Sequence, residues 1–154
     1  MVLTIDIGNT TIGIGGFQGN KLLFIEKISS RRPLSDAGYI EKLNMILNKH
    51  GLSAEAFEGS MISSVVPSVT AVFSSALEAF MGQKPLLLTH ELDLGYEICT
   101  EFPEKVGCDR LADIAGAISR YSLPFVTIDL GTATTFNVLD ENRRFLGGLI
   151  LPGV

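Results

Sequence analysis

The sequence predicts a mixed α/β fold, with one domain built on a mixed sheet with flanking helices and then the opening strands of a second, duplicated domain. The first observation behind this prediction is a repeat, because Thr4–Thr11 (TIDIGNTT) returns as Thr127–Thr134 (TIDLGTAT) at a constant offset of 123 residues. The second is the order of the elements, since strand-like runs come first and helical and strand-like segments then alternate. We therefore expect a first domain over residues 1–122 and the truncated start of a second over residues 123–154.

Strands are expected wherever short apolar runs are bounded by turn residues. At the start of the chain they cover Val2–Gly8, Thr11–Phe17 and Lys21–Ile28. The turn at residues 18–20 joins the last two, which is typical of an antiparallel meander. A buried strand over Gly59–Val66 and a short one over Lys84–Thr89 follow.

Two helices are expected in the middle of the chain, each marked by a start signal, an apolar stripe and a closing glycine. The first begins after the candidate N-cap Ser35 and ends at Gly51, and the second begins at Pro67 and ends at Gly82. The stripes are Ile40, Leu43, Ile46 and Leu47 in the first helix, and Val69, Val72, Phe73, Ala76, Leu77 and Phe80 in the second. Stripes at this spacing indicate core packing.

The last part of the first domain has weaker signals. Glu91–Val106 is polar, irregular and interrupted by Pro103, so we expect a surface loop there. A third helix is expected from about Asp109 to about Tyr121. Its apolar side would consist of Leu111, Ile114, Ala115 and Ile118.

Composition favours a globular, cytoplasmic protein. The chain is 46% hydrophobic and 19% charged, no apolar run is long enough to span a membrane, and no basic leader follows Met1. A formal net charge of −5 argues against nucleic acid as a partner, because binding the phosphate backbone depends on Lys and Arg. Cys99 and Cys108 form no zinc-ligand pattern with the histidines, so we expect reduced thiols.

Each copy of the repeat places an aspartate at the end of an apolar strand and a glycine in the turn that follows. Asp6 and Asp129 are candidates to hold a hydrated magnesium ion. Gly8 and Gly131 would let backbone N–H groups approach phosphate oxygens. One such string alone is more typical of an ordinary hairpin turn, and it is the duplication that favours two loops facing each other across a nucleotide triphosphate.

The segment Gly107–Arg110 combines a flexible residue, a carboxylate and a guanidinium at the start of a helix. Asp109 would accept the proton of a substrate hydroxyl that attacks a terminal phosphate, a role worth about 10² to 10⁴ in rate. Arg110 would bind an anionic substrate group or stabilise developing charge. The structural alternative is that Asp109 is the N-cap and that Arg110 pairs with Asp113 or another carboxylate across the first turn. These residues alone leave both interpretations open.

Four ordered motifs resemble the bacterial type III pantothenate kinases, members of the superfamily of actin, sugar kinases and Hsp70 ATPases. The motifs are Asp6–Thr10, Ser63–Pro67, Pro103–Arg110 and Asp129–Thr135, the last followed by Gly147–Gly153. The resemblance covers essentially the whole chain and implies an actin-like ATPase (ribonuclease H-like) domain. It further implies ATP-dependent phosphorylation of pantothenate to 4'-phosphopantothenate, the first step of coenzyme A biosynthesis. The implied enzyme is a homodimer that uses ATP, Mg²⁺ and a monovalent cation, K⁺ or NH₄⁺.

The same resemblance implies roles for individual residues. Asp109 would be the catalytic base, Asp6 a metal-binding residue, and Asp129 a ligand of the monovalent cation. Pantothenate would be bound by Gly107, Cys108, Asp109 and Arg110. The nucleotide would be bound by Asp6, Gly8, Asn9, Thr10, Thr11, Gly13, Gly131 and Thr132.

The chain also departs from the family pattern. Thr100 stands where many members have a tyrosine that contacts pantothenate, Phe102 where asparagine is common, and Cys108 where alanine is common. A family threonine from the later second-domain region, contributed across the dimer, has no counterpart here. We therefore expect a truncated chain whose active site is incomplete.

Two other functional classes stay open. The first is a non-catalytic regulator on the same fold, against which the retention of Asp6, Asp109 and Asp129 speaks. The second is a superfamily kinase or phosphohydrolase that acts on a different small acceptor, an alternative that Thr100 supports.

Overall fold

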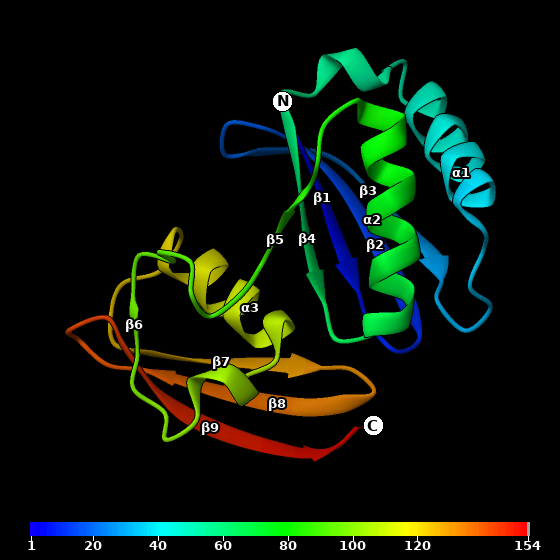
Figure 1. The fold of residues 1–154 in the computed structure, drawn as a ribbon. Coiled ribbons are helices and arrows are strands. Elements are labelled where there is room, and N and C mark those ends of the chain that lie inside the picture. The colour runs from blue at the N-terminus through cyan, green and yellow to red at the C-terminus, as the bar shows by residue number, and fades with distance from the viewer. Residues whose placement is uncertain (154) are drawn as a thin grey trace. The chain divides into compact units, whose positions relative to one another are not determined.

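The computed structural model describes residues 1–153, which fall into two compact units, Met1–Leu87 and Leu88–Val154 (Figure 1). Both units combine strands and helices, so the mixed α/β prediction is confirmed. The units divide between Leu87 and Leu88 rather than at residue 122, because the segment before the second repeat packs with the strands of that repeat. The boundary of the duplication itself stays a prediction.

The sheet of the first unit has the order β3-β2-β1-β4-β5. The strands are β1 Val2–Ile7, β2 Thr11–Gln18, β3 Lys21–Ser29, β4 Gly59–Ser64 and β5 Leu86–Leu87. The first three form the predicted antiparallel meander, whereas β4 pairs parallel to β1 and β5 parallel to β4. Strand β5 covers only two of the residues of the strand predicted over Lys84–Thr89.

Helices α1 (Asp36–Lys49) and α2 (Pro67–Met81) lie side by side on one face of this sheet (Figure 1). The Oγ atom of Ser35 accepts a hydrogen bond from the Gly38 N–H (3.3 Å), so this residue is the N-cap that the sequence predicts. Gly82 ends α2 at φ 72°, a left-handed conformation that favours glycine. The core under the helices includes Leu3, Ile5, Ile7, Ile12, Ile14, Tyr39, Leu43, Leu47, Val69, Phe73 and Leu77. Because side chains alternate along β1, its even-numbered residues face the opposite side of the sheet.

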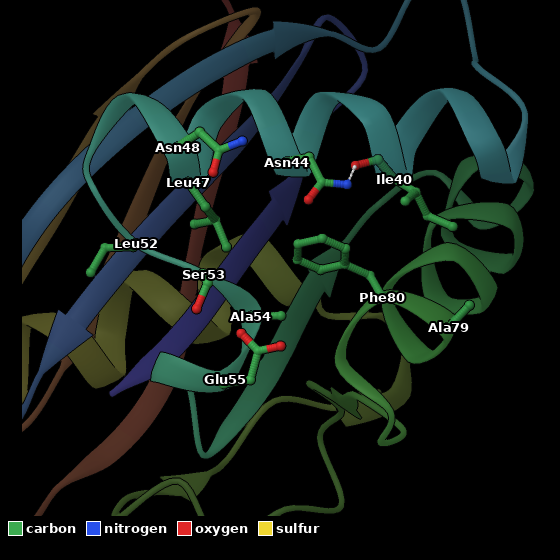
Figure 2. A pocket seen from close by; sticks show the side chains of 10 residues that line it. All are labelled: Ile40, Asn44, Leu47, Asn48, Leu52, Ser53, Ala54, Glu55, Ala79 and Phe80. Carbon is green, nitrogen blue, oxygen red and sulfur yellow. Dashed lines mark hydrogen bonds between the residues drawn. The ribbon is translucent and has the colours of Figure 1, made fainter.

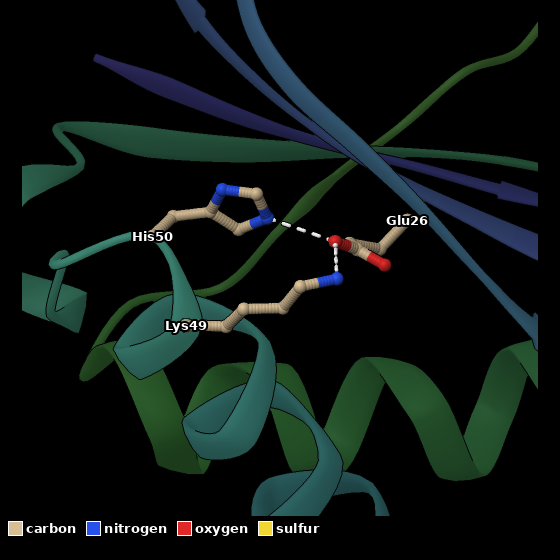
Figure 3. Close-up of polar contacts among 3 residues, drawn as sticks. All are labelled: Glu26, Lys49 and His50. Atoms are coloured by element: carbon tan, nitrogen blue, oxygen red, sulfur yellow. Dashed lines mark hydrogen bonds and ion pairs between the residues drawn. The ribbon is translucent and has the colours of Figure 1, made fainter.

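The C-terminal end of α1 is fastened to β3 by a charged cluster (Figure 3). The Oε1 atom of Glu26 accepts a hydrogen bond from Lys49 Nζ (2.7 Å) and lies 2.9 Å from His50 Nε2. The His50 ring also stacks on Phe24, with the ring centroids 4.5 Å apart. These bonds, first with Lys49 and then with His50, lower the pKa of Glu26 below its ordinary value of 4.5.

The sheet of the second unit has the order β6-β9-β8-β7. The elements are β6 Glu97–Ile98, the 3₁₀ helix η2 Pro103–Lys105, α3 Cys108–Ile118, β7 Phe125–Leu130, β8 Ala133–Leu139 and β9 Arg144–Pro152. The expectation of an irregular loop over Glu91–Val106 is wrong at β6, which pairs parallel to the start of β9. A two-residue strand is too short to show a periodic pattern in sequence. Helix α3 ends at Ile118 rather than near Tyr121.

Helix α3 covers one face of this second sheet, as Figure 1 shows. Ile114 of α3 packs there with Leu139 and Phe145, which are fully buried. The opposite face carries exposed apolar side chains, namely Val126, Ile128, Leu130, Val138, Leu149 and Leu151. Among residues 1–153, no helix is long and apolar enough to cross a lipid bilayer.

Candidate active site

The first repeat copy forms a hairpin whose acidic residue lies on the face of the sheet away from α1 and α2. Asp6 is exposed near the end of β1, opposite Gly13 on β2. The turn is closed from within, because the Gly8 N–H donates to the Thr11 carbonyl oxygen (2.9 Å). Since the Gly8 N–H already has a partner, a bound phosphate would meet other donors of this loop.

The second repeat copy also forms a hairpin, but its register differs by one residue. Asp6 pairs with Gly13, whereas Asp129 pairs with Thr135, the position equivalent to Ile12. The Gly131 N–H donates to the Ala133 carbonyl oxygen (3.1 Å), so the turn is tighter than in the first copy. The repeat predicted both hairpins, but it did not reveal that Thr135 lies opposite Asp129.

Helix α3 presents the predicted chemical segment in its first turn. Gly107 is the N-cap, and Asp109 is a residue of the helix whose Oδ1 accepts a hydrogen bond from the Arg110 N–H (2.8 Å). The alternative that Asp109 is the N-cap is therefore wrong. The Cys108 thiol donates to the Leu88 carbonyl oxygen (3.1 Å), which ties the start of α3 to the preceding segment.

The Arg110 side chain lies on the sheet and is held there by neutral acceptors. Its Nε donates to Asn137 Oδ1 (2.6 Å) and its Nη2 donates to the Phe136 carbonyl oxygen (3.2 Å). The guanidinium carbon is also 5.5 Å from the centre of the Phe145 ring. Burial lowers the pKa of Arg110, and the negative charge of Asp109 acts in the opposite direction. An arginine pKa starts so high that the side chain stays positively charged.

The strand register shows which residues share the face under α3. Asn137 pairs with Thr127 on β7 and with Gly148 on β9, so this polar row lies directly under Arg110. The next row toward the turn contains Asp129 and Thr135, with side chains on the same face. The structure thus brings Arg110 and Asp129 onto one face of one sheet.

The predicted nucleotide-binding residues are divided between the two units. Asp6, Gly8, Asn9, Thr10, Thr11 and Gly13 belong to the first unit, and Gly131 and Thr132 belong to the second. Each set is found in its own hairpin turn or at the strand end beside it. That the two loops face each other across one nucleotide stays a prediction, as do the roles of the individual residues.

Tyr96 and Thr100 lie at or near the sequence position of the family tyrosine, and the structure shows the surroundings of both hydroxyl groups. The Tyr96 hydroxyl donates to the Leu111 carbonyl oxygen (3.0 Å), and burial raises the pKa of Tyr96. The Tyr96 side chain is therefore bonded to α3, and it does not replace the family tyrosine at whose position this chain has Thr100. The Thr100 Oγ1 atom is buried and has no hydrogen-bond partner among the described residues.

The oxygen atoms near the acidic turns fit hard cations. Among residues 1–153, no three His, Cys, Asp or Glu side chains gather closely enough to form a metal site of their own. A magnesium ion needs only one or two carboxylates when it is shared with substrate phosphates, which fits the exposed Asp6. In the second turn, a Cβ atom on Gly153 would collide with the carbonyl oxygens of both Gly131 and Thr132. These two carbonyl oxygens therefore lie close together beside Gly153, and carbonyl oxygens are donors that suit an alkali cation.

The first unit also contains a pocket that is separate from these residues (Figure 2). It has a volume of about 340 Å³ and lies between α1, α2 and the 3₁₀ helix η1 (Ala54–Ala56). Its polar groups include Asn44, whose Nδ2 donates to the Ile40 carbonyl oxygen (3.1 Å), and its apolar wall includes Phe80. None of the predicted site residues lines it.

Solved structures of low sequence identity share the fold of this chain. A ROK hexokinase from Thermus thermophilus aligns with a TM-score of 0.51 at 15% identity, covering 94% of this chain and 47% of the hexokinase. The ethanolamine utilization protein EutJ from Carboxydothermus hydrogenoformans aligns with a TM-score of 0.52 at 13% identity, covering 98% of this chain and 51% of EutJ. The chain thus has the actin-like ATPase fold that the sequence motifs implied.

Sequence comparison identifies the family within this class. The family model for type III pantothenate kinase matches residues 2–154, and the chain belongs to that family. Proteins named type III pantothenate kinase from Thermomicrobium roseum and Bifidobacterium animalis subsp. lactis are 35% and 36% identical to it over 154 residues. These alignments cover 100% of the chain but only 60% and 61% of the relatives, so it spans about three fifths of their length.

Proposed function

We propose that the protein transfers the terminal phosphate of ATP to the primary hydroxyl of pantothenate, as the first step of coenzyme A synthesis in the cytoplasm. The observation that carries this proposal is the family match over residues 2–154, together with relatives named for this reaction. The described residues would supply the two acidic turns and the start of α3, and the further length found in the relatives would complete the site in a homodimer.

The chemistry assigned to α3 follows from its side chains. Asp109 accepts the proton of the attacking hydroxyl, whose oxygen bonds to the terminal phosphorus as ADP leaves. Arg110 binds the carboxylate of pantothenate, because its guanidinium keeps a positive charge and its acceptors on the sheet, Asn137 Oδ1 and the Phe136 carbonyl oxygen, are neutral. The Asp109 carboxylate is turned toward the helix start, where it accepts the Arg110 N–H.

The acidic turns would bind the nucleotide and its cations. Asp6 would hold Mg²⁺, and Asp129 with the Gly131 and Thr132 carbonyl oxygens would hold K⁺ or NH₄⁺. When bound, these cations supply positive charge to the phosphate oxygens. The other polar residues of the two turns, Asn9, Thr10 and Thr11 among them, would contact the phosphates.

The test is an ADP-release assay on the longest available form of the protein with pantothenate, Mg²⁺ and K⁺. Asp109→Asn should lower turnover about 10² to 10⁴-fold, because asparagine can still accept the Arg110 N–H but cannot take up the proton. Glu104→Gln, an exposed acidic residue of η2, is the matched control and should keep full turnover. Equal turnover in Asp109→Asn would refute the assigned base.

The same assay decides whether pantothenate is the acceptor. A panel of small hydroxyl compounds, with and without a carboxylate, should show the highest kcat/KM for pantothenate. A higher kcat/KM for another acceptor would favour the alternative superfamily kinase. ADP release without any acceptor would favour a phosphohydrolase.

A further inference from the structure

We propose that Asn137 and Thr127 are positioning residues that orient the Arg110 guanidinium toward the substrate carboxylate, and that Gly148 keeps the sheet surface clear for it. This inference rests on the proposed function, since it assigns a purpose to the way Arg110 is held. None of these three residues carries a role that the motifs of the sequence imply.

The orientation of the Asn137 amide is determined by its two partners. Asn137 is fully buried, and its Oδ1 accepts from Arg110 Nε (2.6 Å) while its Nδ2 donates to Thr127 Oγ1 (3.0 Å). Arginine has only donors, so the reverse orientation would place the amide N–H groups against the guanidinium N–H groups. A hydroxyl at residue 127 can accept the Nδ2 hydrogen, which supports the amide from the other side.

The sheet occupies one edge of the guanidinium and leaves the other to a ligand. Nε and Nη2 donate to the Asn137 side chain and to the Phe136 carbonyl oxygen. No hydrogen bond is found from Nη1 to any residue of 1–153, so the fork formed by Nη1 and the second Nη2 hydrogen remains for a carboxylate. Such a fork binds carboxylate with two parallel hydrogen bonds, which lysine cannot do.

The partners on the sheet are also neutral, and this matters for charge. An aspartate at residue 137 would have nearly the same shape as asparagine, but it would form an ion pair with Arg110. That pair would neutralise the charge intended for the substrate. The amide of Asn137 orients the guanidinium without this competition.

Gly148 makes room for this arrangement. It pairs with Asn137 across β8 and β9, and a Cβ atom at this position would collide with the Phe136 carbonyl oxygen and lie 3.0 Å from Arg110 Nη2. Any side chain would therefore displace both the guanidinium and one of its acceptors. The glycine at residue 148 is therefore required by the position of the Arg110 side chain as well as by the strand.

The test measures KM for pantothenate and for ATP in Asn137→Asp, with Asn142→Asp as a matched control. Asn142 is exposed in the turn between β8 and β9, so the control adds the same charge to the same unit. We expect Asn137→Asp to raise KM for pantothenate at least about tenfold, with KM for ATP within twofold of wild type. A pantothenate analogue whose carboxylate is replaced by a hydroxymethyl group should show no such increase. An unchanged KM for pantothenate, or equal increases for the acid, the analogue and ATP, would overturn the inference.

A second measurement separates this inference from the proposed function. In the ¹H–¹⁵N spectrum, the Arg110 Nε–H of the wild-type protein should exchange slowly with water because it is bonded to a buried amide. Thr127→Val should speed this exchange and Thr127→Ser should restore it, whether or not the protein phosphorylates pantothenate. Fast exchange in the wild type would refute the positioning role even if the kinase is active. Slow exchange with no turnover of pantothenate would instead refute the proposed function.

Discussion

Replacing Thr100 by valine should stabilise the second unit, because the hydroxyl of this residue is buried and has no hydrogen-bond partner among residues 1–153. The Oγ1 atom is inaccessible to water and makes no hydrogen bond to the described residues. The Thr100 methyl group lies close to the position that a Cβ atom on Gly147 would take, 3.7 Å away. Valine keeps this methyl group and replaces the hydroxyl with a second one of similar size.

The size of the effect follows from the cost of an unpaired polar atom. A buried hydroxyl without a partner costs about 1 to 3 kcal/mol, so we expect Thr100→Val to raise the free energy of unfolding by about 1 kcal/mol. For a chain of this size that corresponds to an increase in Tm of about 2 to 4 °C. Thermal unfolding followed by circular dichroism measures it.

Thr127→Val is the matched control, since it makes the same chemical change in the same unit. Its hydroxyl accepts from Asn137 Nδ2 (3.0 Å), so this variant should be destabilised by about 1 kcal/mol. A lower Tm for Thr100→Val would refute the reasoning, because it would show that the hydroxyl has a stabilising partner. A tenfold higher KM for pantothenate in the same variant would show that the partner of the Thr100 hydroxyl is pantothenate.

Two further predictions concern stability. Gly116→Ala in α3 should raise the free energy of unfolding by about 0.5 to 1 kcal/mol, since Gly116 is exposed and a Cβ atom there would meet nothing within 4 Å. Urea denaturation measures this change, and a loss of stability would contradict the prediction. Because the folded-state pKa of Glu26 is lowered, its ionised form contributes stability that is fully present above the ordinary pKa of 4.5 and is lost as pH falls through the folded value. The stability of Glu26→Gln should therefore decrease less steeply than that of wild type on acidification below pH 4.5, and parallel curves would contradict this.

Local signals predicted most of the first unit. The cap at Ser35, the start at Pro67 and the left-handed Gly82 are features of single residues, and the structure contains each helix where these signals place it. The meander followed in the same way from short apolar runs separated by turns. Strand pairing is a different matter, because β6 exists only through its partner β9, whose paired residues lie 47 positions further along the chain.

The candidate site could be predicted only in part, because some of its contacts join residues that are far apart in the sequence. The segment Gly107–Arg110 was found from its composition and position, but the acceptor of the Arg110 side chain lies 27 residues away on another strand. One signal was present in the sequence, since Asn137 is an amide within the strand Ala133–Leu139, between Phe136 and Val138. A buried amide in such a strand needs hydrogen-bond partners, but the sequence does not say which of the arginines reaches it.

The register of the second hairpin determines that Asn137 can reach Arg110 at all. If the second copy kept the register of the first, Phe136 would lie opposite Asp129, and Asn137 would pair with Ile128 on the face away from α3. The tighter turn at Gly131 shifts the return strand by one residue and turns Asn137 toward the helix. A difference of one residue in the turn therefore decides whether the residue at this position of the return strand faces α3 or the opposite side of the sheet.

The repeat also shows which side of the second sheet is unusual. Ile5 and Ile7 are buried under α1 and α2, whereas their equivalents Ile128 and Leu130 are 57% and 68% exposed. An apolar face of this kind binds hydrophobic dyes and promotes association. We expect a polypeptide of residues 1–154 to bind anilinonaphthalene sulfonate and to self-associate, and Ile128→Lys to reduce both.

Ile25→Lys is the control for that prediction, because Ile25 is a similarly exposed isoleucine on β3 of the first unit, at 60% exposure. If both variants reduce dye binding equally, the effect comes from general surface polarity and not from the face of β7, β8 and β9. If only Ile128→Lys reduces it, the same variant should strongly destabilise any longer form in which this face is covered, since a lysine cannot be buried there without losing its charge or its hydration. Full stability of that longer variant would contradict the view that the face is covered as its counterpart in the first unit is.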